Sequence, residues 1–293
     1  MVLKSYILAA DPAWIEASVL SYYDIVDEIV VSYDITDHGW TGAPIAVEEC
    51  LSRLKAIDSE GKFRYCPGHY ARLDHSPMEN DTYQRQCALD EVGGDAKWVL
   101  QLDTDEVLPN QQALLSMLNV AEERDIPAVE WPMRVLFQKM NDGRLLQVCA
   151  ADRQDRFEYP GPIAIRPGAT LVDARRTAGR FLRPIVLGDN HSLQILHPIE
   201  GNEVRIELSS GSDAILHNSW ARTSSSVRSK IGSWSHNAGL KSWLYYYLRW
   251  KPAPYVWRFM RDFHPFARGL WPALKPFDQL PASIPAEFIE GVA

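Results

Sequence analysis

The chain has 293 residues, a hydrophobic content of 46% and a formal net charge of −8. A chain of this length and composition can bury a core without crosslinks. Its four cysteines are scattered and include no C-x-x-C pair, so we expect reduced thiols and no zinc site. The first apolar run, Tyr6 to Ala10, is too short for a signal peptide or a membrane span. These features favour a cytoplasmic protein.

The charge is distributed unevenly along the chain. Residues 219 to 275 carry ten Lys and Arg against one acid, Asp262, a balance of +9, whereas the other residues sum to −17. Six of the ten Trp also lie in this basic stretch. We therefore predict two regions, a domain over residues 1 to 218 and a helical extension over residues 219 to 293.

Strands and helices alternate over the first hundred residues. Strands are expected at Leu3 to Ala9, Asp27 to Asp34, Lys62 to Cys66 and Trp98 to Leu102, with helices after Asp11-Pro12, around Val47 to Leu54, and at Asp81 to Glu91. This alternation predicts a parallel sheet with right-handed crossovers, in which the C-terminal ends of the strands converge on one edge. Ligands of open α/β sheets bind at that edge.

The pattern changes after a helix expected at Gln111 to Glu123. Apolar residues then alternate strictly from Val129 to Phe137, which predicts a strand with one buried face. Pro132 interrupts this run and places the strand at the edge of a sheet, because proline cannot donate a hydrogen bond to a neighbour.

The segment WVLQLDTDEVLP carries the strongest chemical signal. Asp103 and Asp105 lie two apart after a buried strand, so on an extended segment both carboxylates point toward the binding edge. Two converging carboxylates attract a hard cation such as Mg²⁺ or Mn²⁺, which can bridge a diphosphate and offset its charge. A solvated acidic turn before a helix would show the same motif, so its context has to decide.

The context resembles the glycosyltransferase A fold, and in particular family 2-like glycosyltransferases. The resemblance covers about residues 1 to 110: an opening strand and helix, a second strand ending in an acid, then LDTDE. It implies a Rossmann-like α/β domain with a mainly parallel sheet flanked by helices. It also implies an inverting, Mn²⁺- or Mg²⁺-dependent transfer of a sugar from a nucleoside-diphosphate donor, which Asp103 helps to hold. The acceptor would be a saccharide or a lipid-linked saccharide, in bacterial surface-polysaccharide assembly.

The resemblance assigns further residues to the donor. Asp34, in VSYDITDHG, takes the place of the acid that contacts the nucleotide base, and Asp37 assists it. The loop departs from the usual acid-Ser-Asp-Gly order, and Asp34 could instead cap a loop. Arg85-Gln86 resembles an Arg-Asn pair whose cation holds the donor, although an exposed helical Arg is also ordinary.

A third metal ligand in such enzymes is often a downstream histidine. His217 closes the apolar run Ala214-Ile215-Leu216 and suits this role, and imidazole is an acceptable ligand for Mn²⁺. A structural role is the alternative for a lone histidine. His191, His197 and His236 are the other histidines that we weigh for the same position.

Inverting transfer also needs a carboxylate that removes the proton of the acceptor hydroxyl. Four acids lie in the right part of the chain: Asp152, Asp155, Glu158 and Asp189. Asp189, in LGDNHS, lies where similar enzymes place their base, so we predict it as the catalytic base. A turn formed by Gly-Asp-Asn is the competing interpretation.

The basic, aromatic tail predicts two helices. Val227, Ile231 and Trp234 share one face of the first, and the second runs from Leu240 to Trp250. Lys and Arg mixed with Trp and Tyr is also the composition of an interfacial membrane contact. The tail therefore predicts either a peripheral contact with the inner face of a membrane, through residues 219 to 275, or a packed helical cap.

Two other functions fit the same residues. LDTDEVL also resembles the nucleophile motif of haloacid-dehalogenase-type phosphatases, in which Asp103 would attack phosphorus and Asp105 would act as acid and base. Gly188-Asp189 lacks the second acid that such enzymes carry. A non-catalytic binding module with the transferase fold is the other alternative. An acidic domain without a recognised nucleic-acid module argues against nucleic acid as a partner.

Overall fold

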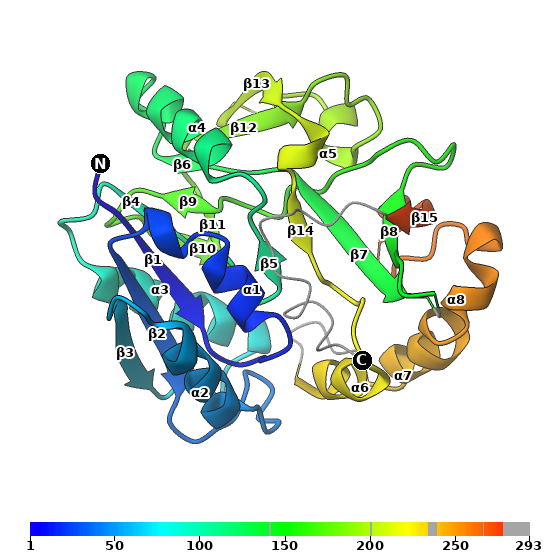
Figure 1. The fold of residues 1–293 in the computed structure, drawn as a ribbon, viewed down its shortest axis with the longest axis horizontal. Helices are drawn as coiled ribbons and strands as arrows, with labels where there is room; N and C mark the ends of the chain where they lie inside the picture. Colours follow the sequence, from blue (N-terminus) through cyan, green and yellow to red (C-terminus); the bar gives the residue numbers. More distant parts are fainter. Residues whose placement is uncertain (141, 200, 234–238, 266, 278–293) are drawn as a thin grey trace.

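A computed structural model describes residues 1–140, 142–199, 201–233, 239–265 and 267–277, and an eight-stranded sheet runs through it (Figure 1). The strand order is β13-β12-β6-β9-β4-β1-β2-β3. The strands are β1 (Leu3–Leu8), β2 (Glu28–Asp34), β3 (Phe63–Gly68), β4 (Trp98–Leu100), β6 (Ala128–Val129), β9 (Ala164–Ile165), β12 (Phe181–Val186) and β13 (Glu203–Ser209). Only β9 runs antiparallel to its neighbours in this sheet. The predicted α/β fold with a mainly parallel sheet is confirmed.

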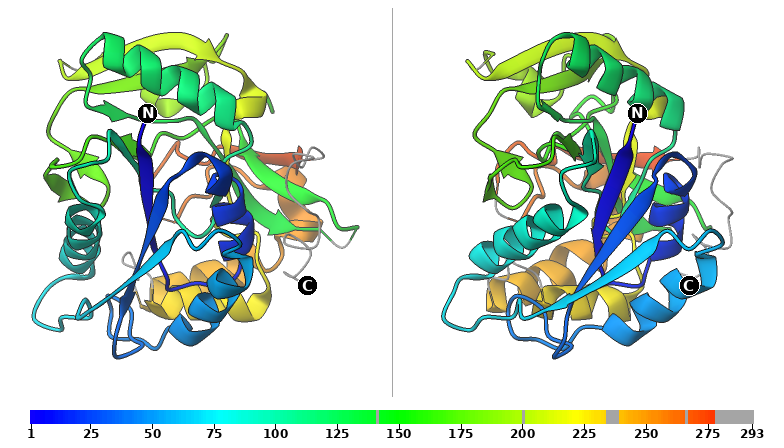
Figure 2. Two further views of the ribbon diagram at one scale, coloured as in Figure 1. Left: turned by 60° about the vertical axis from the view of Figure 1, so that its left-hand side comes forward. Right: turned by 90° about the vertical axis from the view of Figure 1, so that its left-hand side faces the viewer.

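Helices cover both faces of the parallel strands. The helices are α1 (Ile15–Leu20), α2 (Val47–Ile57), α3 (Pro77–Val92) and α4 (Gln111–Glu123). Ile7 and Ile29 pack into a core with residues of α1, α2 and α4, whereas Tyr6 and Val30 pack with residues of α3. Figure 2 shows α3 and α2 on opposite sides of the strands. Burial on both faces explains why β1, β2 and β4 are mostly apolar.

The helix boundaries follow local capping. Helix α4 has the predicted bounds, and the Asn110 side chain caps it by accepting a hydrogen bond from Ala113 N. Helix α3 begins before the predicted Asp81, because Ser76 and Glu79 form a capping box with Pro77 at the first turn.

A second sheet follows the first, in the order β15-β8-β7-β14-β5. Its strands are β5 (Glu106–Val107), β7 (Met133–Lys139), β8 (Leu145–Cys149), β14 (Ile215–His217) and β15 (Ala273–Phe277). The remaining short elements are β10 (Leu171–Asp173), β11 (Arg176–Thr177), α5 (Leu193–Leu196), and the 3₁₀ turns η1 (Tyr23–Ile25) and η2 (Gly211–Asp213).

The strand predicted from Val129 to Phe137 is wrong in two respects. The chain leaves the first sheet after Val129 and enters the second at Met133, so Pro132 separates two strands. Moreover, β7 lies between β14 and β8 rather than at an edge, and both of its faces are buried. Phe137 packs against the C-terminal helices and Leu136 against Trp14 on the other side. An alternating pattern could not show that the second face is covered as well.

The C-terminal helices are α6 (Ser224–Ser233), α7 (Leu240–Tyr245), the π-helical turn η3 (Tyr246–Trp250), α8 (Ala253–Val256) and η4 (Trp257–Phe259). Val227 and Ile231 are buried as predicted, and Trp234 lies outside the described residues. The sequence left open whether the tryptophans of the tail face a membrane or pack as a helical cap, and most of those that the structure describes are packed. Four are buried in a core shared with β7 and β8, namely Trp220, Trp250, Trp257 and Trp271.

This shared core joins the tail to the rest of the chain. Strand β15 pairs with β8 from Ala273 to Phe277. Phe137 of β7 contacts the rings of Tyr245, Phe263 and Trp271. Residues on both sides of the predicted boundary at 218 thus form one packed unit. Within the described residues, no helix is long and apolar enough to cross a membrane.

Replacing Trp250 with alanine should destabilise the protein by about 3–5 kcal/mol, because a large buried side chain leaves a cavity. The indole Nε1 also donates to the carbonyl oxygens of Trp220, at 2.9 Å, and Phe137, at 3.2 Å. Urea unfolding followed by circular dichroism measures the loss. Trp243→Ala is the matched control, since that side chain is 37% exposed and should lose less than about 1 kcal/mol. Equal losses would contradict the packed tail.

Candidate functional site

A cavity of about 540 Å³ lies at the carboxyl ends of the parallel strands. Its lining includes Ala9 after β1, Asp34 at the end of β2 and Asp103 after β4. Later parts of the chain contribute His217 from β14 and Lys230 from α6. The cavity therefore occupies the edge at which open α/β sheets bind ligands.

The segment from Asp103 to Asp105 is a turn rather than the extended segment that we predicted. Glu106 N donates to the carbonyl oxygen of Asp103 at 3.0 Å, and the hydroxyl of Ser18 donates to the same oxygen at 2.8 Å. The turn gives the two carboxylates different neighbours. Both still line the cavity.

Asp103 lies between two arginines. Arg85 Nη2 is 2.8 Å from Oδ1, and Arg175 Nη2 is 2.5 Å from Oδ2. Burial opposes ionisation of this carboxyl, but the positive charges of Arg175 and Arg85 outweigh it and lower its pKa. Asp103 is therefore an anion at neutral pH.

Helix α3 holds Arg85 in place. Arg85 Nε donates to Asp81 Oδ1 at 2.6 Å, one helical turn earlier, and both side chains are buried. The remaining nitrogen, Nη1, is buried and has no hydrogen-bond partner in the described part of the chain. A buried, unpaired guanidinium nitrogen is costly, and because Arg85 lines the cavity, an anionic ligand that drew its guanidinium forward would supply the missing partner.

Arg175 reaches Asp103 from the turn between β10 and β11. Its guanidinium also contacts Glu106 at 2.6 Å and 2.8 Å, and Glu106 is fully buried. Glu106 in turn accepts a hydrogen bond from Asp103 N at 3.0 Å. Gly161 lies against the stem of Arg175, where a β-carbon would approach Arg175 Cγ to 3.1 Å. Arg175 thus fixes the turn that carries the two aspartates.

Asp105 faces the C-terminal region. Its Oδ2 is 2.5 Å from Arg222 Nη2 and 3.1 Å from Lys230 Nζ. His217 Nε2 lies 3.8 Å from Oδ1. Strand pairing explains this proximity, because β14 pairs with β5 so that His217 is opposite Glu106. Arg222 also forms an ion pair with Asp11, after β1.

The predicted metal ligands Asp103, Asp105 and His217 all line this cavity. Two carboxylates suit Mn²⁺ or Mg²⁺, and an imidazole is an acceptable third ligand for Mn²⁺. Among the described residues, however, no three His, Cys, Asp or Glu side chains already surround a common point as ligands. A cation would have to take Asp105 from Arg222 and Lys230. The side chains therefore suit a cation chemically, but in this structure basic side chains occupy both carboxylates.

Asp34 lines the cavity, whereas Asp37 is exposed beside it at a positive φ of 58°. The Asp34 carboxylate accepts four hydrogen bonds: two from Thr36, at 2.8 Å and 2.5 Å, and one each from the backbone of Tyr70, at 2.6 Å, and Ala71, at 2.9 Å. Burial opposes ionisation, but these bonds outweigh it and lower the pKa of Asp34. Asp34 therefore holds two loops together at this end of the cavity.

Two of the candidate bases occupy different surroundings. Asp189 lies in the turn after β12, where Oδ1 accepts from the backbone of His191 and Ser192 at 3.1 Å each, and it is not part of the cavity lining. Glu158 does line the cavity. Burial raises the pKa of Glu158, while a 2.6 Å hydrogen bond from Trp271 Nε1 favours its ionised form. Of these two acids, Glu158 is placed to accept a proton from a ligand.

Several residues of the network were not predicted. Glu106 belongs to the DTDE motif, and its place beside two aspartates could have marked it as a residue of the site. Arg175, Arg222 and Lys230 lie 72 to 125 residues from the aspartates that they contact. Only the folded chain brings them to Asp103 and Asp105.

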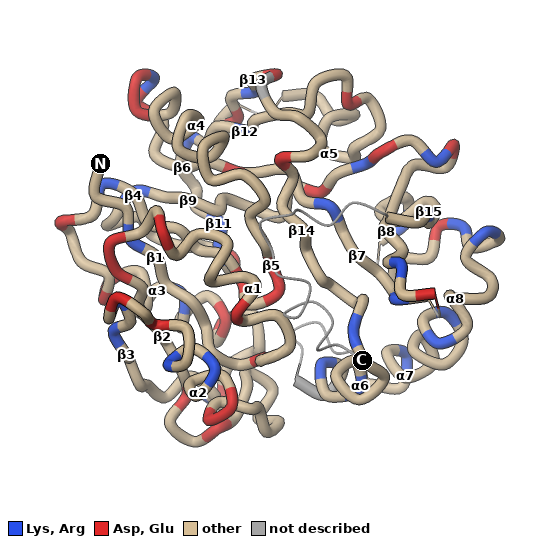
Figure 3. Tube along the Cα trace, in the orientation of Figure 1, with Lys and Arg blue, Asp and Glu red and all other residues tan. Residues whose placement is uncertain are grey.

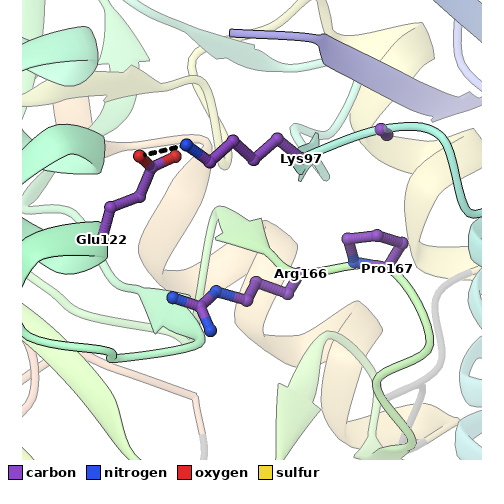
Figure 4. Close-up of a pocket in the computed structure, with 5 residues that line it drawn as sticks. Lys97, Glu122, Arg166 and Pro167 are labelled. Atoms are coloured by element: carbon purple, nitrogen blue, oxygen red, sulfur yellow. Dashed lines mark hydrogen bonds and ion pairs between the residues drawn. The ribbon is translucent and has the colours of Figure 1, made fainter.

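A second, open depression lies near the amino end of β4, opposite the edge that carries Asp103. Figure 4 shows Lys97, Glu122, Arg166 and Pro167 around it. Lys97 and Glu122 form an ion pair of 2.5 Å across it, beside Arg166. Arg166 also pairs with Asp125 at 2.7 Å. These charges neutralise each other in pairs, so we place the functional site in the first cavity.

Comparisons with known proteins leave the activity open. No family model and no curated protein matches this sequence. Structures that resemble it include the 2-C-methyl-D-erythritol 4-phosphate cytidylyltransferase of Francisella tularensis, with 15% identity over 57% of this chain and 74% of that one and a TM-score of 0.34. The 4-diphosphocytidyl-2C-methyl-D-erythritol synthase of Anaerococcus prevotii has 14% identity over 57% and 70%, with a TM-score of 0.31. A mannose-6-phosphate isomerase of Helicobacter pylori has 12% identity over 57% and 61%, with a TM-score of 0.30. TM-scores this low support no inference about activity.

Replacing Arg175 with methionine should destabilise the protein by about 3–5 kcal/mol, because it leaves the buried Glu106 carboxylate without its ion-pair partner. Adding Glu106→Gln should restore part of the loss, since the uncompensated charge is then gone. Chemical denaturation of the wild type, both single variants and the double variant measures the coupling. A double variant no more stable than Arg175→Met would show that the ion pair does not fix this turn.

Proposed function

We propose that the protein is a glycosyltransferase of the glycosyltransferase A type, which moves a sugar from a nucleoside-diphosphate donor to a saccharide or a lipid-linked saccharide. One observation carries this proposal. Asp103 and Asp105 lie in a cavity at the carboxyl edge of a parallel sheet, and four cationic side chains contact them there. An enzyme that releases a diphosphate needs this combination of carboxylates and fixed positive charges.

The basic side chains would contact the diphosphate. Arg85 has an unpaired nitrogen. Lys230 has a flexible side chain, and its ammonium group donates to Asp105 and, at 3.0 Å, to the carbonyl oxygen of Ser219. An incoming diphosphate offers Arg222 and Lys230 a second anionic partner. Their departure from Asp105 would free that carboxylate for a cation.

The charge of the cavity supports a role for Mn²⁺ or Mg²⁺. The lining carries seven Asp and Glu against five Lys and Arg, a formal balance of −2, and a diphosphate adds further negative charge. Asp103, Asp105 and His217 would hold the cation. When bound, it offsets the charge that develops on the departing diphosphate. We therefore propose that donor and cation bind cooperatively.

The nucleotide would lie toward Asp34. This residue fixes the loops around that end of the cavity, where His38 and Trp40 also line the wall. Trp40 is held by a 2.7 Å hydrogen bond from its Nε1 to Gln84. In this proposal Asp34 shapes the base pocket, and Asp37 completes its rim.

Glu158 is the base that we propose for an inverting transfer, in place of Asp189. It would take the proton of the acceptor hydroxyl as the oxygen attacks the anomeric carbon. Its raised pKa brings the carboxylate closer to the neutral range in which a general base works best.

The phosphatase alternative fits these contacts less well. It requires an Asp103 oxygen to attack phosphorus, yet each Asp103 oxygen contacts a guanidinium group. Such contacts lower the nucleophilicity of a carboxylate. A non-catalytic module would bind the nucleoside-diphosphate sugar without turning it over. An assay of the hydrolysis of this donor therefore distinguishes such a module from an enzyme.

Asp105→Asn should lower the affinity for a nucleoside diphosphate with Mn²⁺ at least about tenfold, because a neutral amide attracts a divalent cation poorly. Titration calorimetry measures this loss after a screen of UDP-, GDP- and dTDP-sugars has identified the base. EDTA should reduce the wild-type affinity to a similar level. Asp24→Asn, at an exposed acid away from the cavity, is the control. An unchanged affinity in Asp105→Asn would remove the metal-assisted part of the proposal.

Glu158→Gln should reduce turnover about 10²- to 10⁴-fold with little change in donor affinity. A base must be ionised, so activity should fall as pH drops through a pKa above the ordinary range of glutamate. Trp271→Phe removes the hydrogen bond that stabilises the anion, so this acid limb should move to higher pH. Trp243→Phe should leave the limb in place. An acid limb that Trp271→Phe does not move would exclude Glu158 as the group that titrates.

A further inference from the structure

The helix formed by α7 and η3 has apolar side chains on two opposite sides. Tyr245, Tyr246 and Trp250 are buried against the shared core. Leu240, Leu244 and Leu248, spaced four apart, are exposed by 75%, 49% and 67%. Residues four apart lie on one side of a helix, so these leucines form an outer apolar stripe. A helix on the surface of a soluble domain normally presents a polar outer face.

Further exposed apolar side chains follow the stripe along the chain. Eight of the eighteen large hydrophobic side chains that are exposed in the described residues lie between residues 240 and 259. Trp243 and Tyr247 belong to the same helix, and Tyr255 and Phe259 follow on α8 and η4, exposed by 73% and 83%. Such a concentration of exposed apolar side chains indicates an interaction surface.

The charge of this segment identifies the kind of partner. Residues 240 to 261 contain five Lys and Arg and no Asp or Glu, and all five cations are exposed: Lys241, Arg249, Lys251, Arg258 and Arg261. Figure 3 shows the basic residues gathered along α6, α7 and α8. A second copy would bring like charges together. An anionic surface is complementary to the cations and accepts leucine and aromatic side chains at its interface.

We propose that the leucine stripe of α7 and η3, flanked by these five cations, docks the protein on an anionic lipid surface. The four buried tryptophans belong to the core on which the inner side of this helix packs. The leucine stripe on its outer side contacts the boundary between lipid headgroups and acyl chains. The protein would lie on the membrane without crossing it.

The chain on either side of the docking segment reaches the cavity. Lys230 of α6 and Leu270, on either side of residues 240–261, both line the cavity wall. Docking would hold the protein at the membrane, where a lipid-linked acceptor resides. This last step rests on the proposed function, whereas the docking itself does not.

Co-sedimentation of the full chain with vesicles tests the proposal, using phosphatidylcholine alone and phosphatidylcholine with phosphatidylglycerol. We expect binding to the anionic vesicles only, weakening as salt rises through roughly 0.15 M. The triple variant Leu240→Ser, Leu244→Ser and Leu248→Ser should bind the anionic vesicles at least about tenfold more weakly than the wild type. Lys251→Gln with Arg258→Gln and Arg261→Gln should weaken binding at low salt.

The matched control removes three leucines that are equally exposed elsewhere, by Leu73→Ser, Leu187→Ser and Leu196→Ser, with exposures of 83%, 73% and 64%. It should bind like the wild type. No binding to anionic vesicles at low salt, or equal loss in both triple variants, would overturn the proposal. A concentration-dependent dimer in sedimentation velocity that only the stripe variant abolishes would assign the surface to a second copy instead. Nucleoside-diphosphate affinity, measured on the same variants, should stay unchanged, so a failure of docking is distinguishable from a failure of the proposed function.

Discussion

The contact of Arg175 with Glu106 and Asp103 is the interaction on which the site depends. Glu106 is fully buried, so its charge requires the guanidinium of Arg175 at 2.6 Å. The same carboxylate accepts the backbone N–H of Asp103. The pair therefore fixes the turn from Asp103 to Glu106 at the end of β4. With that turn fixed, Asp103 faces α3 and Asp105 faces the C-terminal region.

The second half of the site comes from the tail of the chain. Strand β14 pairs with β5 and places His217 near Asp105, and the chain after β14 supplies Arg222 and Lys230. These cations hold their positions because the tail shares a core with β7 and β8. The basic charge of residues 219 to 275 thus serves two surfaces. Part of it neutralises a buried aspartate, and part of it is exposed along α7 and α8.

The sequence was informative where local chemistry decides the structure. The parallel strands, the bounds of α4 and the place of Asp103 and Asp105 at a sheet edge follow from apolar runs, caps and the direction of strands. The sequence was uninformative where contacts between distant segments determine the structure. The partners of both aspartates come from far along the chain, and the second face of β7 is covered by helices that follow nearly a hundred residues later. Composition also could not decide between a core and a membrane-facing position for the tryptophans, because a side chain suited to an interface is equally suited to a core.

The most direct measurement is a crystal structure of the protein with a nucleoside diphosphate and Mn²⁺. Our account predicts the diphosphate beside Arg85, Arg222 and Lys230, and Mn²⁺ bound by Asp103 or Asp105 in place of their basic partners. The base should lie toward Asp34. A nucleotide bound away from this cavity, with the contacts of Asp103 and Asp105 unchanged, would contradict the assignment of the site.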